Sequence, residues 1–396
     1  MRSIEKPTRV LHVIDSLSYE SGGPLRSVVD LSAAGMRFGL QSEILGTKPV
    51  YIPDNPLGVE HIHSVASFSV CGYLYARGLK DWCRANLQRF DGVMLHGMWS
   101  NLNRAVSREC LTRGLPYIVC PHGMLDLWSV RGQGIMKCLK KTIYWHLYER
   151  KLVENSNGIV FTLQREMDNS KQTFSFPHVR TFVVAPFGMV PVSPLSANEE
   201  PDTQIRQDDA AKIVLFLGRV HPVKRPDILI EAWSAAGLPS DWRLLVAGFG
   251  DPAYLTQLAK LTEQKGVGDS IQFVGPVAGV NKRYLLQRAS WFLLSSQHEN
   301  FGVAVLEAAS ARCAIAISDQ VYLADEFPEG AEVLPLQVDA WTRFMRERMT
   351  NTAWRDETAQ RVSDHLKAKF DQESVVRRWV DTICSGLGTT GRVDPQ

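Results

Sequence analysis

The sequence predicts an α/β fold with two parallel-sheet domains, and three observations support this prediction. The chain has 396 residues, which is more than one hydrophobic core usually supports. Short apolar runs alternate with segments of helical periodicity, as is typical of strands joined by crossover helices. A stretch rich in Pro, Ser and acidic residues at 191–211 separates two such series. We therefore expect one domain over 1–190 and a second over 212–371, joined by this linker.

The composition is that of an ordinary soluble protein. Hydrophobic residues make up 45% of the chain and charged residues 22%, and the net charge of +2 does not indicate a nucleic-acid partner. The seven cysteines are scattered and never spaced Cys-x-x-Cys, which argues for reduced thiols in a cytosolic compartment. No signal-peptide pattern and no apolar run of about 20 residues is present. We expect a cytoplasmic protein whose only membrane contact is peripheral, at the inner face of the cytoplasmic membrane.

The first domain carries glycines and histidines where parallel strands end. Its expected strands are 9–15, 42–46, 92–95, 116–120, 157–162 and 179–185, and its expected helices are 24–38, 72–90 and 101–113. Gly22 and Gly23 follow the first strand, where glycine lets the backbone approach a ligand; a plain tight turn is the alternative. A lone histidine is more often packed or solvated than bound to a ligand. Because His96 and His122 both lie in His-Gly turns at the ligand-binding edge of the sheet, we expect ligand contact.

The second domain places cations and glycines at the same kind of edge. Its expected strands are 213–217, 244–247, 271–274, 291–294 and 314–317, and its expected helices are 228–236, 303–311 and others within 340–370. Arg219 and Lys224 follow the first of these strands and can bind phosphate oxygens, Arg as a fork and Lys as a point charge. Gly248 and Gly250 belong to a Gly-x-Gly-x-x-Ala string, which dinucleotide dehydrogenases also show. No acidic residue ends the next strand to bind a ribose, so that alternative is disfavoured.

Two carboxylates, Glu299 and Glu307, bracket an expected helix start at Gly302. Unpaired backbone N–H groups and the positive end of the helix dipole favour phosphate oxygens at such a start. Ionised carboxylates only accept hydrogen bonds, so they would bind hydroxyl groups on either side of the phosphates. This pattern indicates a nucleotide sugar. The alternative is that Glu299 caps the helix and Glu307 is a solvated helical residue.

The whole string from Ser295 to Ala308 resembles the E-x7-E signature of the retaining glycosyltransferases of family 4. The Gly-Arg…Lys arrangement from Gly218 to Lys224 matches the same family, and the resemblance covers nearly the whole chain. It implies the GT-B fold, in which two Rossmann-like domains face each other across a cleft. A C-terminal helix, expected here at 372–387, crosses back to the first domain, and a disordered tail follows at 388–396. The chain departs from the family pattern at Phe187, Arg225 and Gln320, the last where a Gly-Gly turn is common.

The resemblance also implies a reaction. It is a metal-independent, retaining transfer of a hexose-type sugar from a nucleoside diphosphate to an acceptor hydroxyl, without a cofactor, in polysaccharide or lipid-linked glycan synthesis. Arg219, Lys224, Glu299 and His122 would be the catalytic residues, and His96 would line the acceptor side. The residues implied to bind the donor are Gly22, Gly23, Gly218, Gly248, Gly250, Asn300, Phe301, Gly302 and Glu307.

Two other functions fit the same architecture. A sugar-nucleotide epimerase would release nucleotide without needing an acceptor. A non-catalytic scaffold subunit would bind nucleotide sugars only, but it has no reason to retain Arg219, Lys224, Glu299 and Glu307 together. Basic and aromatic residues at 137–151 fit either an anionic membrane surface or a helix whose aromatic face packs on the sheet, and the packed helix is favoured.

Overall fold

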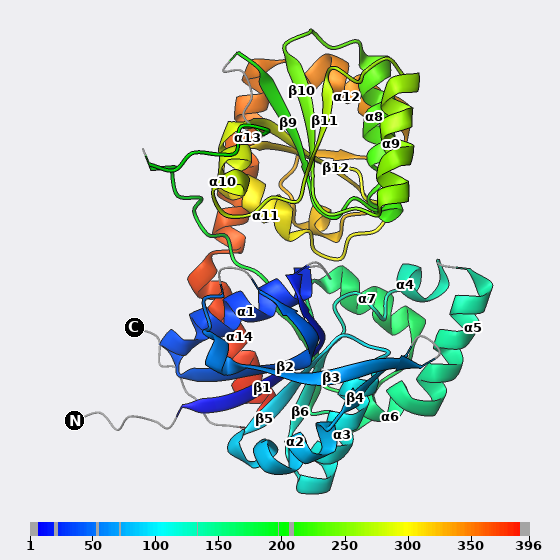
Figure 1. Ribbon diagram of the computed structural model, residues 1–396, viewed down its shortest axis with the longest axis vertical. Helices are drawn as coiled ribbons and strands as arrows, with labels where there is room; N and C mark the ends of the chain where they lie inside the picture. Colours follow the sequence, from blue (N-terminus) through cyan, green and yellow to red (C-terminus); the bar gives the residue numbers. More distant parts are fainter. Residues whose placement is uncertain are drawn as a thin grey trace. The chain divides into compact units, whose positions relative to one another are not determined.

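The computed structural model describes residues 7–19, 23–52, 55–70, 73–132, 134–196, 198–205 and 210–388. Its internal contacts divide the chain into two units. The first unit comprises Met1–Gly188 with Gln372–Gln396, and the second comprises Met189–Asp371. Each unit is built on one sheet with helices on both faces (Figure 1).

The sheet of the first unit has the strand order β4-β3-β2-β1-β5-β6-β7-β8. Its strands are β1 Thr8–Ser18, β2 Leu40–Tyr51, β3 Ile62–Val70, β4 Tyr73–Arg77, β5 Gly92–His96, β6 Tyr117–Cys120, β7 Gly158–Phe161 and β8 Thr181–Val183. All neighbouring strands are parallel except β3 and β4, which form an antiparallel pair. The carboxyl ends of β1, β5 and β6 therefore lie next to one another along one edge of the sheet.

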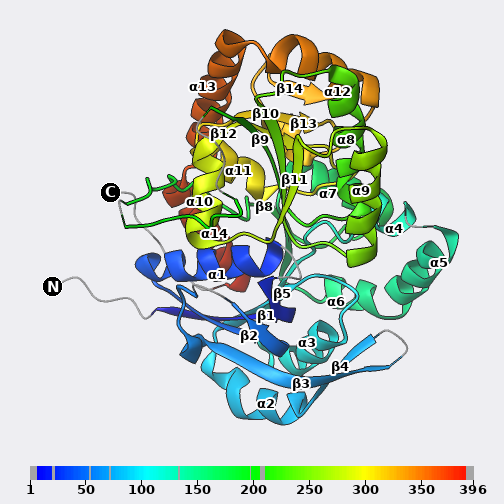
Figure 2. The same cartoon turned by 45° about the horizontal axis from the view of Figure 1, so that its top comes forward.

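Helices cover both faces of this sheet (Figure 2). The helices of the first unit are α1 Gly23–Gly35, α2 Leu79–Asn86, α3 Asn101–Arg113, α4 Leu127–Arg131, α5 Ile135–Tyr144, α6 Arg150–Glu154, α7 Gln164–Thr173 and α14 Gln372–Leu387, with a π-helical turn at Trp145–Glu149. Residues Leu11 and Val13 of β1 pack toward α2 and α3, whereas Ile14 and Leu17 pack toward α1. The neighbouring residues Val13 and Ile14 thus pack on opposite faces, as a strand buried on both faces requires, and Leu17 follows a register shift at Ser16.

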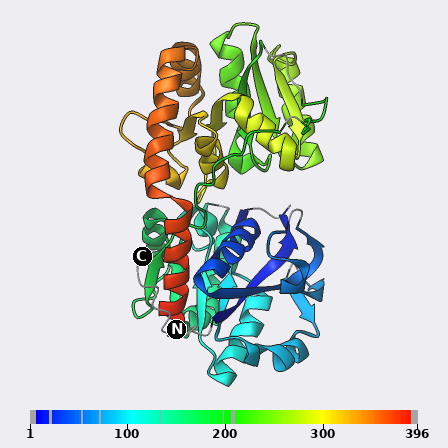
Figure 3. The ribbon, with the colours of Figure 1, turned by 90° about the vertical axis from the view of Figure 1, so that its left-hand side faces the viewer.

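The C-terminal helix α14 belongs to the first unit, where it contacts α1 and β6 (Figure 3). Its apolar face, with Val376, Trp379 and Ile383, is buried. Gly386 and Gly92 leave room for this contact, since an added Cβ would lie 2.5 Å from the Ile118 side chain in one case and 2.4 Å from Leu387 in the other. Residues 389–396 of the predicted tail lie outside the described part of the chain.

The prediction of one helix over 72–90 was wrong. Tyr73–Arg77 forms β4, and only Leu79–Asn86 is α-helical. The strand forms because it pairs with β3, a strand that the sequence analysis did not identify, and Phe68 stacks on Tyr75 across the pair with ring centroids 5.8 Å apart.

The second unit contains a six-stranded parallel sheet in the order β11-β10-β9-β12-β13-β14. Its strands are β9 Lys212–Leu217, β10 Trp242–Ala247, β11 Ile271–Gly275, β12 Ala289–Leu294, β13 Ala314–Ser318 and β14 Glu332–Leu334. Its helices are α8 Pro226–Ala236, α9 Pro252–Gln264, α10 Gly279–Arg288, α11 Val303–Ser310, α12 Val338–Phe344 and α13 Thr352–Lys369. Helices α8 and α9 cover one face, and α10, α11 and α13 cover the other (Figure 1).

The described part of the predicted linker packs against the second unit. Arg283 of α10 pairs with Glu199, Asn281 Nδ2 donates to Asp202 Oδ2 over 2.6 Å, and Gln287 Nε2 donates to the Ser193 carbonyl over 2.7 Å. The segment has little secondary structure of its own, but these bonds hold it along one helix.

Candidate functional site

In the second unit, the predicted site residues follow three neighbouring strands. Strand β9 lies between β10 and β12, so the segments after these strands emerge side by side at one edge of the sheet. Arg219 follows β9, Gly248 follows β10, and Glu299 follows β12. The parallel sheet thus brings together residues that are up to 80 positions apart in the sequence.

The loops after β9 and β10 contact each other through their backbones. The N–H of Gly218 donates to the Ala247 carbonyl over 3.0 Å, and the N–H of Val220 donates to the Phe249 carbonyl over 2.6 Å. Gly248 has a φ of 147°, and an added Cβ would lie 1.8 Å from the Gly218 carbonyl oxygen. Gly218 and Gly248 lie directly after β9 and β10, as the sequence predicts. Gly248 is also required for packing, because the Gly218 carbonyl leaves no room for a Cβ.

Lys224 and Glu299 form an ion pair between the segments after β9 and β12. Their side chains are 17% and 18% exposed. Lys224 ends a short 3-10 turn, Pro222–Lys224, and Arg225 continues it with a left-handed φ of 49°. The Ser295 hydroxyl fixes this turn by donating to the carbonyls of Lys224 and Arg225, over 3.1 and 2.8 Å.

The pKa of Lys224 is unusually low for a lysine. Burial, followed by the nearby charge of Arg219, lowers the pKa of Lys224 to about 8. Arg219 itself is exposed. The edge of the sheet therefore holds one exposed cation and one partly desolvated cation close together, an arrangement suited to an anion with more than one charge.

The segment from Glu299 to Gly302 leads into α11. The Glu299 backbone bridges to the loop after β13, where Tyr322 N donates to the Glu299 carbonyl over 3.0 Å. Gly302 precedes α11 with a φ of 82° and is the helix N-cap, as predicted. The side chain of Phe301 is 4% exposed and packs edge-on against Phe370 in the core, and the donor contact expected of its backbone stays a prediction. Asn300 is half-buried.

Glu307 has a partner that the sequence analysis missed. Its Oε1 lies 2.6 Å from Lys282 Nζ of α10, and both side chains are mostly buried. Glu307 is therefore not the solvated helical residue of the alternative interpretation. The signal for Lys282 was weak, because nothing in the sequence links a lysine on one helix to a glutamate 25 positions later.

In the first unit, three histidines form a stacked, hydrogen-bonded row. His12 Nδ1 lies 3.0 Å from His96 Nε2, and His96 Nδ1 lies 2.9 Å from His122 Nε2. Both pairs of ring centroids are 5.2 Å apart. The structure thus brings together His96 and His122, as adjacent strand ends predict, and adds His12, whose signal was a polar residue inside a buried apolar strand.

All three rings are neutral near pH 7, because each pKa is lowered. Burial lowers the pKa of His12 to about 3 and that of His122 to about 4. Burial also lowers the pKa of His96 well below its usual range, and the two neighbouring rings lower it further. The row is therefore a set of hydrogen-bonding groups and carries no charge.

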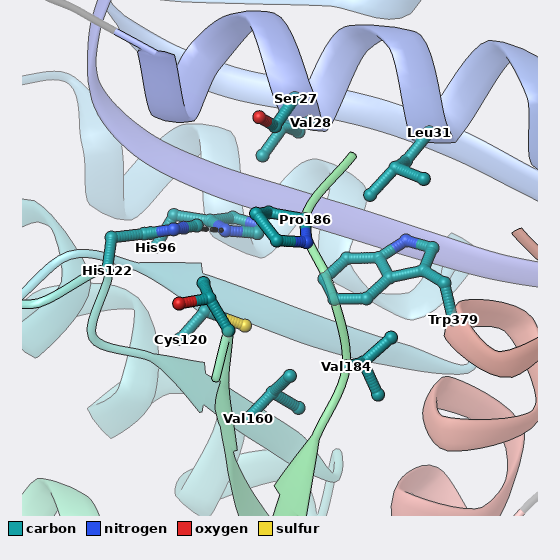
Figure 4. A pocket seen from close by; sticks show the side chains of 11 residues that line it. Ser27, Val28, Leu31, His96, Cys120, His122, Val160, Val184, Pro186 and Trp379 are labelled. Carbon is teal, nitrogen blue, oxygen red and sulfur yellow. Dashed lines mark hydrogen bonds between the residues drawn. The ribbon is translucent and has the colours of Figure 1, made fainter. Parts of the chain in front are cut away.

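A small pocket lies beside His96 and His122 (Figure 4). Its lining comes from α1, from the ends of β5, β6 and β7, from the segment after β8 and from α14: Ser27, Val28, Leu31, His96, Cys120, His122, Val160, Thr162, Val184, Pro186 and Trp379. Its volume is about 10 Å³, enough for about one water molecule. Gly23 opens α1 and is exposed, and an added Cβ would meet nothing within 4 Å. Gly22 lies outside the described residues.

Glu166 and Glu149 are buried carboxylic residues of the first unit that the sequence analysis did not identify. Glu166 of α7 accepts from the backbone N–H of Gly123 over 2.5 Å and from that of Thr162 over 2.7 Å, and so holds the turn that contains His122. Glu149 accepts from the Trp99 N–H over 3.1 Å. Burial, with a smaller contribution from the charge of Asp15, raises the pKa of Glu149 to about 8.

The basic and aromatic segment at 137–151 is divided between core and surface. Tyr144 and Trp145 are buried, as the packed-helix interpretation expects. The other apolar side chains of α5 and the turn after it are exposed: Ile135, Met136, Leu139, Ile143 and Leu147. Together with Arg104, Lys137, Lys140, Tyr75, Tyr144 and Tyr148, most of them line a groove of about 670 Å³. Among the described helices, none is long and apolar enough to cross a bilayer.

Comparison with known sequences matches part of the chain to a family model. Residues 198–334 match the model for "Glycosyl transferases group 1". A GDP-mannose:cellobiosyl-diphosphopolyprenol alpha-mannosyltransferase from Xanthomonas oryzae pv. oryzae is 29% identical over 182 residues, covering 45% of this chain and 48% of the relative. A D-inositol 3-phosphate glycosyltransferase from Salinispora arenicola is 29% identical over 164 residues, covering 39% and 37%. The chain spans about half or less of the length of these curated relatives.

Comparison with solved structures concerns the fold. The Anabaena protein HepE, solved in complex with UDP and glucose, superposes with a TM-score of 0.73 at 14% identity, covering 96% of this chain and 100% of the other. WaaG, a glycosyltransferase involved in lipopolysaccharide biosynthesis, gives a TM-score of 0.71 at 16% identity, covering 94% and 99%. The predicted GT-B architecture is confirmed. Residues 198–334 thus match the glycosyl transferases group 1 model, and the fold of the chain is that of GT-B glycosyltransferase structures.

Proposed function

We propose that this protein is a retaining glycosyltransferase that moves a hexose-type sugar from a nucleoside diphosphate sugar to an acceptor hydroxyl. The observation that carries this proposal is the cluster of Arg219, Lys224 and Glu299 beside the start of α11. Two adjacent cations and a helix N-terminus favour a diphosphate, and a carboxylate beside them favours the hydroxyls that flank it.

In this proposal, the cations stabilise the leaving group. As the bond between the sugar and the diphosphate breaks, negative charge grows on the phosphate oxygens, and Arg219 and Lys224 offset it. Lys224 is held close to Glu299 before the donor arrives, so the donor phosphate would compete with Glu299 for the same ammonium group. Glu299, released in part, would then accept hydrogen bonds from the sugar hydroxyls, and Glu307 would accept from the ribose hydroxyls.

The stereochemical and metal-independent parts of the proposal rest on the resemblance to family 4. In that family, the leaving phosphate takes the proton from the acceptor hydroxyl on the same face of the sugar. No separate base is then needed to remove this proton. Arg219 and Lys224 supply the positive charge that a metal ion supplies in other transferases.

The acceptor class is proposed from the relatives. The Xanthomonas relative is named for GDP-mannose and a diphosphopolyprenol-linked cellobiose, and WaaG for lipopolysaccharide synthesis. A lipid-linked or polysaccharide acceptor is therefore the class that we propose for this chain.

A panel of nucleotide sugars tests the transfer. The purified chain is incubated with UDP-glucose, UDP-galactose, GDP-mannose or ADP-glucose and scored by thermal shift and by nucleotide release, with and without diphosphoprenol-linked cellobiose. We expect one donor to stabilise the protein and to lose its sugar to the acceptor with its anomeric configuration retained, in the presence of EDTA. Acceptor-independent conversion of the sugar would indicate an epimerase, and binding without turnover a scaffold. If none of the donors binds, the proposal is wrong.

We also propose that α5 lies on an anionic membrane surface. Its exposed apolar residues occupy positions 135, 136, 139 and 143, a spacing that places them along one side of a helix. Residues 127–148 include Arg131, Lys137, Lys140 and Lys141 but no Asp or Glu. Apolar side chains that enter the interface, next to cations that attract anionic headgroups, are the features of an interfacial helix.

Vesicle flotation tests this contact. We expect the protein to float with vesicles of phosphatidylcholine and phosphatidylglycerol but not with phosphatidylcholine alone. The variant Leu139→Glu/Ile143→Glu should remain in the soluble fraction. Leu111→Glu, at an exposed apolar residue on α3, is the matched control and should float normally. Equal flotation of all three proteins would refute the assignment.

A further inference from the structure

The histidine row extends across four adjacent strands and ends at a serine. Ser42 lies on β2, His12 on β1 and His96 on β5, and His122 lies two residues beyond β6; these four strands are consecutive in the sheet. The Ser42 hydroxyl lies 3.2 Å from His12 Nε2. The hydrogen-bonded sequence is therefore Ser42, His12, His96 and His122.

The geometry allows only two hydrogen-bond orders. Each contact between rings joins an Nδ1 to an Nε2, and exactly one of the two nitrogens must carry the shared proton. Because the rings are neutral, each carries one N–H. The three rings therefore have the same tautomer: all carry the proton on Nδ1, or all carry it on Nε2.

The hydrogen bonding of Ser42, at the far end of the row, selects between these two orders. Ser42 is 2% exposed, and its hydroxyl has no other hydrogen-bond partner in the described part of the chain. If His12 donated to Ser42, the serine proton would be buried without an acceptor, which is costly. If Ser42 donates to His12 Nε2, every hydrogen bond of the row is made. The favoured order therefore runs from Ser42 towards His122, with all three protons on Nδ1.

The near end of the row is the part available to a ligand. His122 is half-buried, and its Nε2 already accepts from His96 in the favoured order. Its Nδ1 has no partner among the described residues. His122 has a left-handed φ of 52°, and the hydrogen bond from Gly123 N to Glu166 holds the turn around it.

We propose that Ser42, His12 and His96 are positioning residues that fix the tautomer of His122, so that a neutral His122 presents its Nδ1–H as a hydrogen-bond donor to an oxygen of the ligand. The ligand part of this statement rests on the proposed function, in which His122 contacts the donor sugar; the tautomer part does not. An N–H donor selects an acceptor oxygen and holds the ring in one orientation without introducing a charge.

Nuclear magnetic resonance tests the tautomer part directly. Protein labelled with ¹⁵N-histidine is recorded near neutral pH without ligand, because the nitrogen shifts distinguish N–H from unprotonated nitrogen. We expect His12, His96 and His122 all to carry the proton on Nδ1. Observation of Nε2–H on any of the three rings would overturn the proposal, whatever the result with nucleotide sugars.

Variants at Ser42 test the coupling. Ser42→Thr keeps the hydroxyl and should keep the wild-type tautomers. Ser42→Asp puts an acceptor at the far end and should move the proton to Nε2 in all three rings, with a loss of about tenfold or more in kcat/KM for the active donor of the panel. His178→Gln, an exposed histidine of the first unit, is the control and should change neither readout.

The histidine tautomers and kcat/KM test different parts of the proposal. Reversed tautomers with unchanged kcat/KM would refute the positioning role, because His122 would then not donate to the ligand. If no donor is turned over, the proposed function fails, while the tautomers still decide the order of the row. If Ser42→Asp does not fold, the wild-type and Ser42→Thr spectra decide it.

Discussion

Lys224 and Glu299 form a mostly buried ion pair at the carboxyl edge of the second sheet. The attraction between the two charges holds both side chains near the start of α11. Removing only one partner would leave the other charge buried without compensation. A diphosphate could take the place of the carboxylate on Lys224 without leaving the ammonium group unpaired.

The first prediction concerns the two cations. Lys224→Ala or Arg219→Ala should each lower kcat/KM by about a hundredfold or more, because each removes positive charge from the site where negative charge develops. Lys212→Ala is the matched control, since Lys212 lies at the opposite end of β9 in an exposed pair with Asp241. Steady-state kinetics with the active donor measure the effect. Near-normal turnover of either site variant would contradict the assignment.

The second prediction concerns pH. The pKa of Lys224 is lowered to about 8, so its positive charge is lost as the pH rises through this value. We expect kcat/KM for the donor to fall above about pH 8, approaching tenfold per pH unit. Lys224→Arg keeps a charge that does not titrate and should lack this alkaline limb, although its rate will be lower. An identical limb in the Lys224→Arg variant would assign the titration to another group.

The third prediction concerns Glu307 and Lys282. Glu307→Gln should raise the KM for the donor by about tenfold with little change in kcat, because a ribose contact is the same in the ground and transition states. Lys282→Met leaves the carboxylate in place and should change KM less. If the pair only stabilises α10 against α11, both variants will lower the melting temperature equally and leave the KM of the donor unchanged.

The sequence predicted the strands of both sheets other than β3, β4 and β14, because buried parallel strands are short apolar runs and ligand-binding turns follow them. It failed where pairing between distant residues decides the structure. Strand β4 depends on β3, the role of His12 depends on two other strands, and Lys282 meets Glu307 through the packing of two helices. The ring of Phe301 faces Phe370 in the core, and the donor contact expected of its backbone stays a prediction.

The fourth prediction concerns the stability of the first unit. Glu149 is 1% exposed and its pKa is raised to about 8, whereas the unfolded chain releases this proton near pH 4.3. Between these values the unfolded state binds fewer protons than the folded state, so this group lowers the free energy of unfolding as the pH rises, by at most about 1.4 kcal/mol per unit. Glu149→Gln cannot titrate and should lose less stability across this window.

Urea denaturation at several pH values measures this difference. Glu154→Gln is the control, since Glu154 is exposed on the next turn and pairs with Arg150. The wild type and the Glu154→Gln variant should show the same pH dependence. A Glu149→Gln variant with that same dependence would show that Glu149 is ionised in the folded protein.

The fifth prediction concerns the contact between the loops after β9 and β10. Gly248→Ala would place a Cβ 1.8 Å from the Gly218 carbonyl oxygen, so the loops must separate and their hydrogen bonds must lengthen. Gly237→Ala is the matched comparison, because Gly237 also has a positive φ, 62°, but has nothing within 4 Å of an added Cβ. We expect Gly237→Ala to cost about 1 kcal/mol, the strain of the left-handed backbone alone. Gly248→Ala should cost more than about 4 kcal/mol; equal losses in thermal unfolding would mean that the loops can separate freely.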